Sequence, residues 1–232
     1  MNNVDPSEIN KFRALSSRWW DETGDLKSLH DINPLRLQFI KDNAPLAQAK
    51  IIDIGCGGGI LTESLAQSGA QLTGIDMNDE AINVAKLHAE ESDLQIDYQV
   101  STAENIAKQL PEQFDIITCM ELLEHVPEPA HVIQACATLL KPGGKVFFST
   151  INRTLKAYLQ AVIAGEYILQ LLPKGTHDYA KLIRPSELNT WCEKSGLAIK
   201  KMMGMTYNPL SKQYKLIQNI SVNYLVYAEK QR

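Results

Sequence analysis

The amino-acid sequence predicts an α/β fold, with an open, doubly wound and mostly parallel sheet of seven strands and helices on both faces. Short apolar, β-branched runs alternate with helical segments from residue 50 onward, and this alternation is typical of parallel sheets. A glycine-rich turn joins the first strand to the first of these helices. With 232 residues, 44% of them hydrophobic and 22% charged, the chain is long enough for one domain with a buried core.

The expected strands are short segments rich in apolar and β-branched residues. They cover residues 50–54, 71–75, 96–100, 114–119, 145–150, 197–205 and 222–229. The expected helices cover residues 60–68, 79–91, 102–110, 130–140 and 185–195. In such sheets ligands bind outside the carboxyl ends of the strands, so the residues that follow several strands are expected to share one crevice.

Two segments do not follow the alternation within the expected single domain, residues 1–232. Residues 1–49 include two adjacent tryptophans and are expected to form an N-terminal helical flank or lid. Residues 152–184 are expected as a helical insertion after the fifth strand, very apolar over 155–172, with five cations against two carboxylates and a net charge of +3. Such a helix suits an anionic membrane surface, and it equally suits a buried cap or a dimer interface.

Composition excludes several classes of function. The net charge is −4, whereas a nucleic-acid-binding domain is usually basic, so no nucleic-acid partner is expected. The four cysteines are scattered without a C-x-x-C pair, which argues against a zinc site or a disulfide framework and fits a reducing compartment. The first residues lack a basic and then apolar segment, so we expect no secretory signal and a cytoplasmic location.

The glycine-rich turn is followed by an acidic residue at the end of the next strand. Gly55 and Gly57 free the backbone to approach a ligand, and Asp76 is placed to accept hydrogen bonds from ribose hydroxyls. Ile60 occupies the position of the third glycine in the dinucleotide fingerprint G-x-G-x-x-G. The pattern therefore favours S-adenosylmethionine, which has no pyrophosphate. A nicotinamide-dependent oxidoreductase and a purely structural glycine turn are the alternatives.

Three further positions are candidates for the cofactor site. Met120 and Ser101 both follow strand ends, and Ser101 stands where an adenine amino group would be read. A helix N-cap is the alternative interpretation of Ser101. Arg36, in the N-terminal flank, carries a guanidinium that can bind a carboxylate group in a bidentate manner.

The run from Cys119 to Pro127 carries the candidates for catalysis. If one turn of it is helical, Glu121, Glu124 and His125 share a face. Methyl transfer from S-adenosylmethionine to an oxygen requires the acceptor hydroxyl to lose its proton. A phenolic hydroxyl, with a pKa of ~10, is mostly protonated at neutral pH. Histidine, with an ordinary pKa of ~6.5, is suited to remove this proton as a general base. Alternatively, the two carboxylates and the imidazole hold a divalent ion, or the glutamates are solvated and His125 only caps the turn.

Several motifs carry a resemblance to a known family. Asp53-Ile-Gly-Cys-Gly-Gly-Gly59, Thr73-Gly-Ile-Asp76, Cys119-Met-Glu-Leu-Leu-Glu-His125 and Leu140-Lys-Pro-Gly-Gly144 resemble the class I methyltransferases, whose fold is Rossmann-like. Further motifs resemble the bacterial ubiquinone-biosynthesis O-methyltransferases along nearly the whole chain. These motifs are Arg18-Trp-Trp-Asp21, Ile32-Asn-Pro-Leu-Arg36, Phe148-Ser-Thr-Ile-Asn-Arg153, Pro173-Lys-Gly-Thr-His-Asp178 and Val222-Asn-Tyr224.

The resemblance implies an enzyme that performs both O-methylations of ubiquinone biosynthesis, on a polyprenyl catechol and on demethylubiquinol. It implies that Arg36, Gly55, Asp76 and Met120 contact S-adenosylmethionine, and that a magnesium requirement would fall on the Glu121, Glu124 and His125 set. A polyprenyl substrate also implies peripheral association with the inner membrane and contact with other proteins of the pathway. Another class I small-molecule methyltransferase and a non-catalytic lipid-binding protein are the alternatives.

Overall fold

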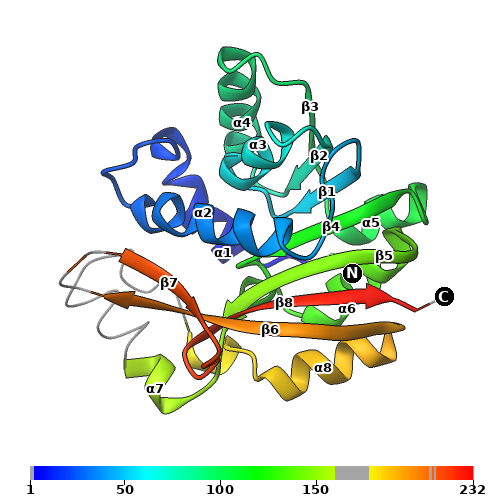
Figure 1. Ribbon diagram of the computed structural model, residues 1–232. Helices are drawn as coiled ribbons and strands as arrows, with labels where there is room; N and C mark the ends of the chain where they lie inside the picture. The colour runs from blue at the N-terminus through cyan, green and yellow to red at the C-terminus, as the bar shows by residue number, and fades with distance from the viewer. Residues whose placement is uncertain (1–2, 160–177, 209–210, 212, 232) are drawn as a thin grey trace.

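The computed structural model describes residues 3–159, 178–208, 211 and 213–231 (Figure 1). Its strands form one eight-stranded sheet in the order β3-β2-β1-β4-β5-β8-β6-β7. The strands are β1 (Lys50–Ile54), β2 (Gln71–Asp76), β3 (Ile96–Val100), β4 (Phe114–Met120), β5 (Leu140–Ile151), β6 (Leu197–Asn208), β7 (Gln213–Ile217) and β8 (Asn223–Lys230).

The strand pairing confirms the predicted architecture and corrects its strand count. β3, β2, β1, β4 and β5 pair in parallel, while β8, β6 and β7 are added in antiparallel pairs. β7, at the edge, is the eighth strand that the sequence analysis did not predict. Within the described part of the chain, its five residues pair only with β6, where Tyr214 lies opposite Tyr207 with ring centroids 4.8 Å apart. Such a short strand depends on cross-strand contacts that a local pattern does not reveal.

Helices cover both faces of the sheet, as predicted. One face carries α2, α3 and α4, and the other carries α5, α6 and α8 (Figure 1). Their bounds are α2 (Lys27–Lys41), α3 (Ile60–Ala66), α4 (Asp79–Glu91), α5 (Ala103–Gln109), α6 (Pro129–Leu139) and α8 (Pro185–Lys194). The alternating residues of the central strands serve the two cores, because Ile52 and Ile54 face α5 and α6 while Ile51 faces α2 and α3.

The N-terminal flank is helical, as expected. It consists of α1 (Pro6–Arg13), the short 3-10 helix η1 (Ser16–Arg18) and α2. Asp5 caps α1 by accepting a hydrogen bond from the Ser7 amide at 3.0 Å. The flank packs Trp19 and Leu26 against Ile60 at the start of α3. It therefore lies over the glycine-rich turn that connects β1 to α3.

Only the ends of the expected insertion belong to the described part of the chain. They contain the helical turn α7 (Leu155–Ala157) and the 3-10 helix η4 (Tyr179–Lys181). The rings of Tyr158 and Tyr179 meet edge to face with centroids 5.5 Å apart. Most of the apolar helix expected over 155–172 lies outside the described residues. No helix among the described residues is long and apolar enough to cross a membrane.

Candidate functional site

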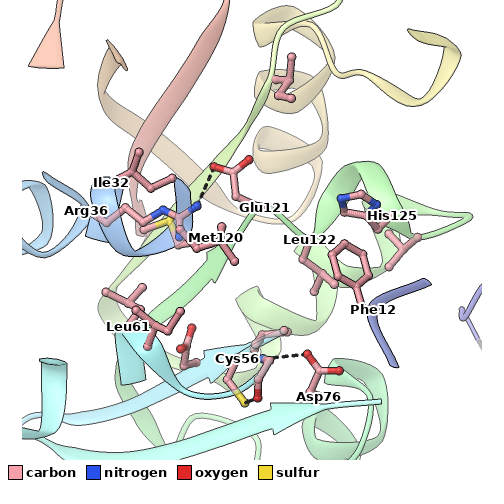
Figure 2. A pocket seen from close by; sticks show the side chains of 18 of the residues that line it. Phe12, Ile32, Arg36, Cys56, Leu61, Asp76, Met120, Glu121, Leu122 and His125 are labelled. Carbon is pink, nitrogen blue, oxygen red and sulfur yellow. Dashed lines mark hydrogen bonds and ion pairs between the residues drawn. The ribbon is translucent and has the colours of Figure 1, made fainter. Parts of the chain in front are cut away.

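One cavity of about 580 Å³ opens at the carboxyl ends of β1, β2 and β4. The strand order reverses between β1 and β4, which is where open α/β sheets bind their ligands. All predicted site residues except Glu124 line this cavity: Arg36, Gly55, Gly57, Asp76, Ser101, Met120, Glu121 and His125. In Figure 2, Arg36 lies on one side of Glu121 and His125 on the other, with Asp76 below.

The glycine-rich turn needs backbone conformations that other residues rarely adopt. Gly55, Gly57 and Gly59 have φ angles of 74°, 53° and 92°, in the left-handed region that glycine enters without steric cost. The turn is tied to β2, because the Gly57 amide donates to Asp76 Oδ2 at 2.9 Å and the Gly55 amide donates to the Ile75 carbonyl at 2.8 Å. The predicted cofactor loop and the predicted ribose-binding acid therefore form one unit.

The glycines of this turn are also required because the N-terminal flank packs closely against it. A Cβ atom at Gly57 would lie 2.1 Å from Trp19 Cζ2, and one at Gly58 would lie 2.3 Å from Trp19 Cγ. The neighbouring Trp20 donates from Nε1 to the Gly58 carbonyl at 2.9 Å, and its ring stacks on His88 with centroids 3.5 Å apart. The two tryptophans thus hold the flank against the turn. From the sequence alone, two adjacent tryptophans indicated only that this segment must be buried somewhere.

Asp76 keeps acceptor capacity in spite of its backbone contacts. Its Oδ1 accepts the Asn78 amide at 2.8 Å, and its Oδ2 accepts the Gly57 amide. Burial raises the pKa of Asp76, while these amide hydrogen bonds act in the opposite direction. Each carboxylate oxygen has a further lone pair, so the group can still accept hydrogen bonds from two hydroxyls in the cavity.

Ser101 lines the cavity next to β2, with its amide donating to the Asp76 carbonyl at 3.1 Å. The alternative interpretation of Ser101 as a helix N-cap is wrong. Thr102 caps α5 instead, because its Oγ1 accepts the Asn105 amide at 3.2 Å. The Ser101 side chain is thereby left on the cavity side of the helix start.

Arg36 brings a buried positive charge to the cavity wall. Its side chain is only 7% exposed, and its Nη2 atom lies 3.1 Å from Glu121 Oε1. Neither Nε nor Nη2 of Arg36 makes a hydrogen bond within the described part of the chain. A buried guanidinium with unsatisfied donors is suited to a carboxylate ligand, because planar bidentate pairing satisfies two donors at once.

Glu121 and Glu124 have different environments although they are three residues apart. Glu121 has a φ of 51° and accepts a hydrogen bond from Ser149 Oγ at 2.7 Å. Glu124 lies behind the cavity, where Thr150 Oγ1 donates to its Oε2 at 2.8 Å. Its Oε1 has no partner among the described residues. Burial, followed by the nearby charge of Glu121, raises the pKa of Glu124 to about 8.

His125 lies at the opposite side of the cavity, in the 3-10 helix η2 (Leu123–His125). Its Nδ1 lies 3.0 Å from Glu8 Oε2 of α1. The Phe12 ring packs edge-on against the imidazole, with centroids 5.2 Å apart (Figure 2). The sequence analysis did not identify Glu8, because nothing in the spacing of α1 indicates that it meets a residue 117 positions away.

The three side chains expected for magnesium do not form a metal site in this arrangement. Glu121 faces Arg36 and Ser149, Glu124 faces Thr150, and His125 faces Glu8. Within residues 3–159, 178–208 and 213–231, no group of three or more histidine, cysteine, aspartate or glutamate side chains is arranged to hold a metal ion. The donor set therefore does not fit the expected ion as these side chains stand.

Comparison with known proteins identifies the family of this chain. A family model described as a methyltransferase domain matches residues 27–201. The chain is 60% identical over 231 residues to the ubiquinone biosynthesis O-methyltransferase of Stutzerimonas stutzeri, covering 100% of both chains. It is 58% identical over 228 residues to the protein of that name from Nitrosococcus oceani, covering 98% of this chain and 97% of the relative.

Solved structures show the same fold at low sequence identity. Magnesium protoporphyrin IX methyltransferase from Synechocystis, solved with bound S-adenosylhomocysteine, superposes with a TM-score of 0.71 at 19% identity, covering 98% of this chain and 100% of that one. A SAM-dependent methyltransferase from Methanosarcina mazei gives a TM-score of 0.64 at 21% identity, covering 83% and 97%. The fold expected from the sequence is confirmed, and the full-length relatives show that the chain belongs to the ubiquinone biosynthesis O-methyltransferase family.

Proposed function

We propose that this methyltransferase transfers a methyl group to phenolic hydroxyls at two steps, on a polyprenyl catechol and on demethylubiquinol. One observation carries the proposal: a single cavity joins a buried guanidinium, a ribose-type carboxylate and a histidine. These groups are Arg36, Asp76 and His125. Residues 1–232 act as one domain in this proposal, because the flank and the last strands both line the cavity.

The cavity fits S-adenosylmethionine, which supplies an electrophilic methyl group when it is bound. Arg36 would bind the carboxylate of the amino-acid tail with its unsatisfied donors. Asp76 would accept hydrogen bonds from the ribose hydroxyls, and the turn at Gly55 and Gly57 allows close approach of the ligand. Ser101 would contact the adenine, and Met120 would pack beside the sulfonium.

His125 would act as the general base. The hydroxyl of a catechol is a poor nucleophile while it keeps its proton, and a neutral imidazole can accept that proton as the oxygen attacks. The Nδ1 atom of His125 is engaged by Glu8, so proton acceptance falls to Nε2.

The acceptor half of the cavity suits an aromatic ring with an apolar tail. Ile151, Met205 and Val222 line this part, together with Lys156 of α7 in the insertion. Each methylene of a polyprenyl tail that leaves an apolar environment costs ~0.8 kcal/mol. A wall that reaches the insertion would therefore let the ring enter while the tail stays in an apolar environment.

The described ends of the insertion support peripheral binding to an anionic inner membrane from the cytoplasmic side. Leu155 and Leu159 are 70% and 50% exposed, and Tyr179 is 40% exposed. Lys156 lies beside them in an exposed position. Apolar side chains flanked by cations are suited to an interface with anionic lipids. Other proteins of the ubiquinone pathway are further proposed partners at this surface. We propose no nucleic-acid partner.

Magnesium stays a prediction of the family resemblance alone. Binding at Glu121, Glu124 and His125 would require these side chains, which now face different partners, to turn toward one common point. Methyl transfer measured with added magnesium and with EDTA tests the requirement directly.

The decisive experiment is methyl transfer from labelled S-adenosylmethionine to a catechol that carries a prenyl tail and to the matching demethylubiquinol. We expect label in both acceptors and a lower KM than for the same phenols without a tail. His125→Ala should lower kcat and leave cofactor affinity nearly unchanged. Binding to liposomes without any methyl transfer would favour a lipid-binding protein, and thermal stabilisation by NAD but not by S-adenosylmethionine would favour an oxidoreductase.

A further inference from the structure

Two polar side chains at the start of β8 have no role in the function proposed so far. Ser221 and Asn223 flank Val222 in the chain and line the acceptor half of the cavity together with it. The neighbouring wall is apolar, with Ile151 and Met205 buried beside them. In a mainly apolar pocket, a few placed polar groups fix the orientation of the ligand, so these two side chains are candidates for reading the acceptor.

The hydroxyl of Ser221 is left without a partner. Its Oγ is buried and makes no hydrogen bond to any described residue. The backbone of Ser221 is fully engaged, because its amide donates to Asn219 Oδ1 at 2.9 Å and its carbonyl accepts from Thr154 Oγ1 at 2.7 Å. An unpaired buried hydroxyl is unfavourable, so a polar ligand atom that pairs with it gains binding energy.

Asn223 offers a free donor beside this hydroxyl. Its Oδ1 accepts the Met205 amide at 2.8 Å. A backbone amide can only donate, so this contact fixes the oxygen toward Met205 and leaves the NH2 group on the other branch of the side chain. Within the described part of the chain, Nδ2 donates no hydrogen bond. The cavity wall therefore presents one group that donates or accepts and one that only donates.

The two groups belong to a segment that is held firmly by the residues after β5. The Asn152 amide donates to the Val222 carbonyl at 2.8 Å, and Asn152 Nδ2 donates to the Ile220 carbonyl at 2.9 Å. Asn223 itself pairs with Ile151 across the sheet. These contacts fix the segment before a ligand arrives, and preorganised polar groups bind at a lower entropic cost.

The position in the sheet suits contact with the acceptor. Met120, beside which the sulfonium is proposed to lie, ends β4, and β5 separates β4 from β8 (Figure 1). Adjacent strands lie ~4.8 Å apart, so β8 is about 10 Å from β4. An aromatic ring between them can direct one oxygen to the methyl group and a second oxygen to β8.

We propose that Ser221 and Asn223 bind a second oxygen of the acceptor ring, on the carbon next to the hydroxyl that is methylated. This inference rests on the proposed function, because both proposed acceptors carry such a neighbouring oxygen. The Asn223 NH2 donates to it whether it is a hydroxyl or an ether, and the Ser221 hydroxyl can donate or accept. The pair thereby selects rings with two adjacent oxygens over simple phenols and fixes which hydroxyl faces the methyl group.

Ser221→Ala is the first test, measured with two acceptors that share one short prenyl tail. One acceptor is a catechol, and the other is the monophenol that lacks the second hydroxyl. We expect kcat/KM for the catechol to fall about tenfold, the scale of one lost hydrogen bond, and kcat/KM for the monophenol to stay at the wild-type level. The ratio of the two acceptors is compared between proteins, so their different acidities cancel.

Two controls separate recognition from a structural role. Ser186→Ala, at an exposed position of α8, should leave the ratio unchanged. Ser221 Oγ has no partner among the described residues, so denaturant unfolding of Ser221→Ala should match the wild type. A purely structural hydroxyl predicts lower stability and equal losses for both acceptors. Either that result or an unchanged ratio would overturn the inference.

Asn223→Asp tests the donor separately. A carboxylate oxygen still accepts the Met205 amide, but the NH2 donor becomes a second acceptor. A phenol whose neighbouring oxygen is a methyl ether then faces an acceptor only, and its kcat/KM should fall tenfold or more. The matching catechol can donate to the carboxylate and should lose less. Equal losses for the ether and the catechol would remove Asn223 from the subsite.

The same assays distinguish failure of this inference from failure of the proposed function. If the wild-type protein methylates neither the catechol nor the monophenol, the proposed function itself is wrong. If it methylates the catechol and the ratio is unaltered in Ser221→Ala, only the oxygen-binding role of Ser221 and Asn223 is lost.

Discussion

The guanidinium of Arg36 and the carboxylate of Glu121 form an ion pair on the cavity wall, with Nη2 and Oε1 3.1 Å apart. A cofactor carboxylate that binds Arg36 must share the guanidinium with Glu121. Ser149 Oγ also donates to the same Glu121 oxygen at 2.7 Å, which holds Glu121 beside Arg36. The relationship predicts that the two residues affect cofactor affinity in opposite directions.

Arg36→Ala should weaken S-adenosylmethionine binding tenfold or more, because hydrogen bonds to a charged group contribute about 1.5–3 kcal/mol. Asp76→Ala should weaken it by a similar factor through loss of the ribose contacts. Glu121→Gln should tighten binding about threefold, the scale of a partly exposed ion pair. Isothermal titration calorimetry measures all three, with Asp97→Ala at an exposed position of β3 as the control. Equal affinities in the wild type and Arg36→Ala would remove Arg36 from the site.

Glu124 should make the free energy of unfolding depend on pH. Its pKa in the folded protein is raised to about 8 from an ordinary 4.5. As the pH rises through this window, the unfolded chain loses the proton first, so the folded state becomes less stable. Each unit of pKa difference corresponds to about 1.36 kcal/mol. Glu124→Gln cannot ionise and should lose this slope.

Urea denaturation at several pH values between about 5 and about 8 measures this effect. The advantage of Glu124→Gln over the wild type should grow with pH. Glu128→Gln, at an exposed position nearby, serves as the control and should follow the wild-type curve. If the free energy of unfolding depends on pH in the same way for the wild type and Glu124→Gln, Glu124 titrates alike in the folded and the unfolded state.

The contact between Trp19 and Gly58 should appear as an energetic coupling. Gly58→Ala places a Cβ 2.3 Å from Trp19 Cγ and should destabilise the protein by about 1–3 kcal/mol through overpacking. Trp19→Ala should cost about 3–5 kcal/mol through the lost burial. In the double variant the alanine at position 58 no longer clashes, so the combined loss should be about 0.5–3 kcal/mol smaller than the sum. Additive losses in denaturant unfolding would show that the indole does not limit position 58.

Exposed leucines at the insertion should contribute to membrane binding. Replacing Leu155 and Leu159 by aspartate should reduce co-sedimentation with vesicles of anionic phospholipid, because burial of a leucine side chain contributes about 1.5–3 kcal/mol. The matched control is Leu87→Asp on α4, which is 61% exposed. Methyl transfer to a short-chain soluble catechol should persist in both variants. Equal vesicle binding by all three proteins would place the membrane contact elsewhere.

Local patterns were sufficient to predict the architecture and eight of the residues that line the cavity. The β-branched runs and the glycine turn determine the parallel strands, because their backbone requirements are local. Asp76 and His125 were found from their place after a strand, and Arg36 was found from its guanidinium in the N-terminal flank. The structure brings all three to one cavity. β7 was missed because its stability comes from pairing with β6, a non-local contact.

Tertiary packing decided the features that depend on residues far apart in the chain. The burial of Glu8 against His125 and the indole of Trp19 over the glycine turn both arise from docking of the N-terminal flank. The separation of Glu121, Glu124 and His125 onto different partners likewise follows from neighbours on other elements. The chemical groups of the site, and the strand ends that carry most of them, can be read directly along the chain. Only the folded chain decides which group orients which, because electrostatic and hydrogen-bond contacts depend on distances of a few ångströms.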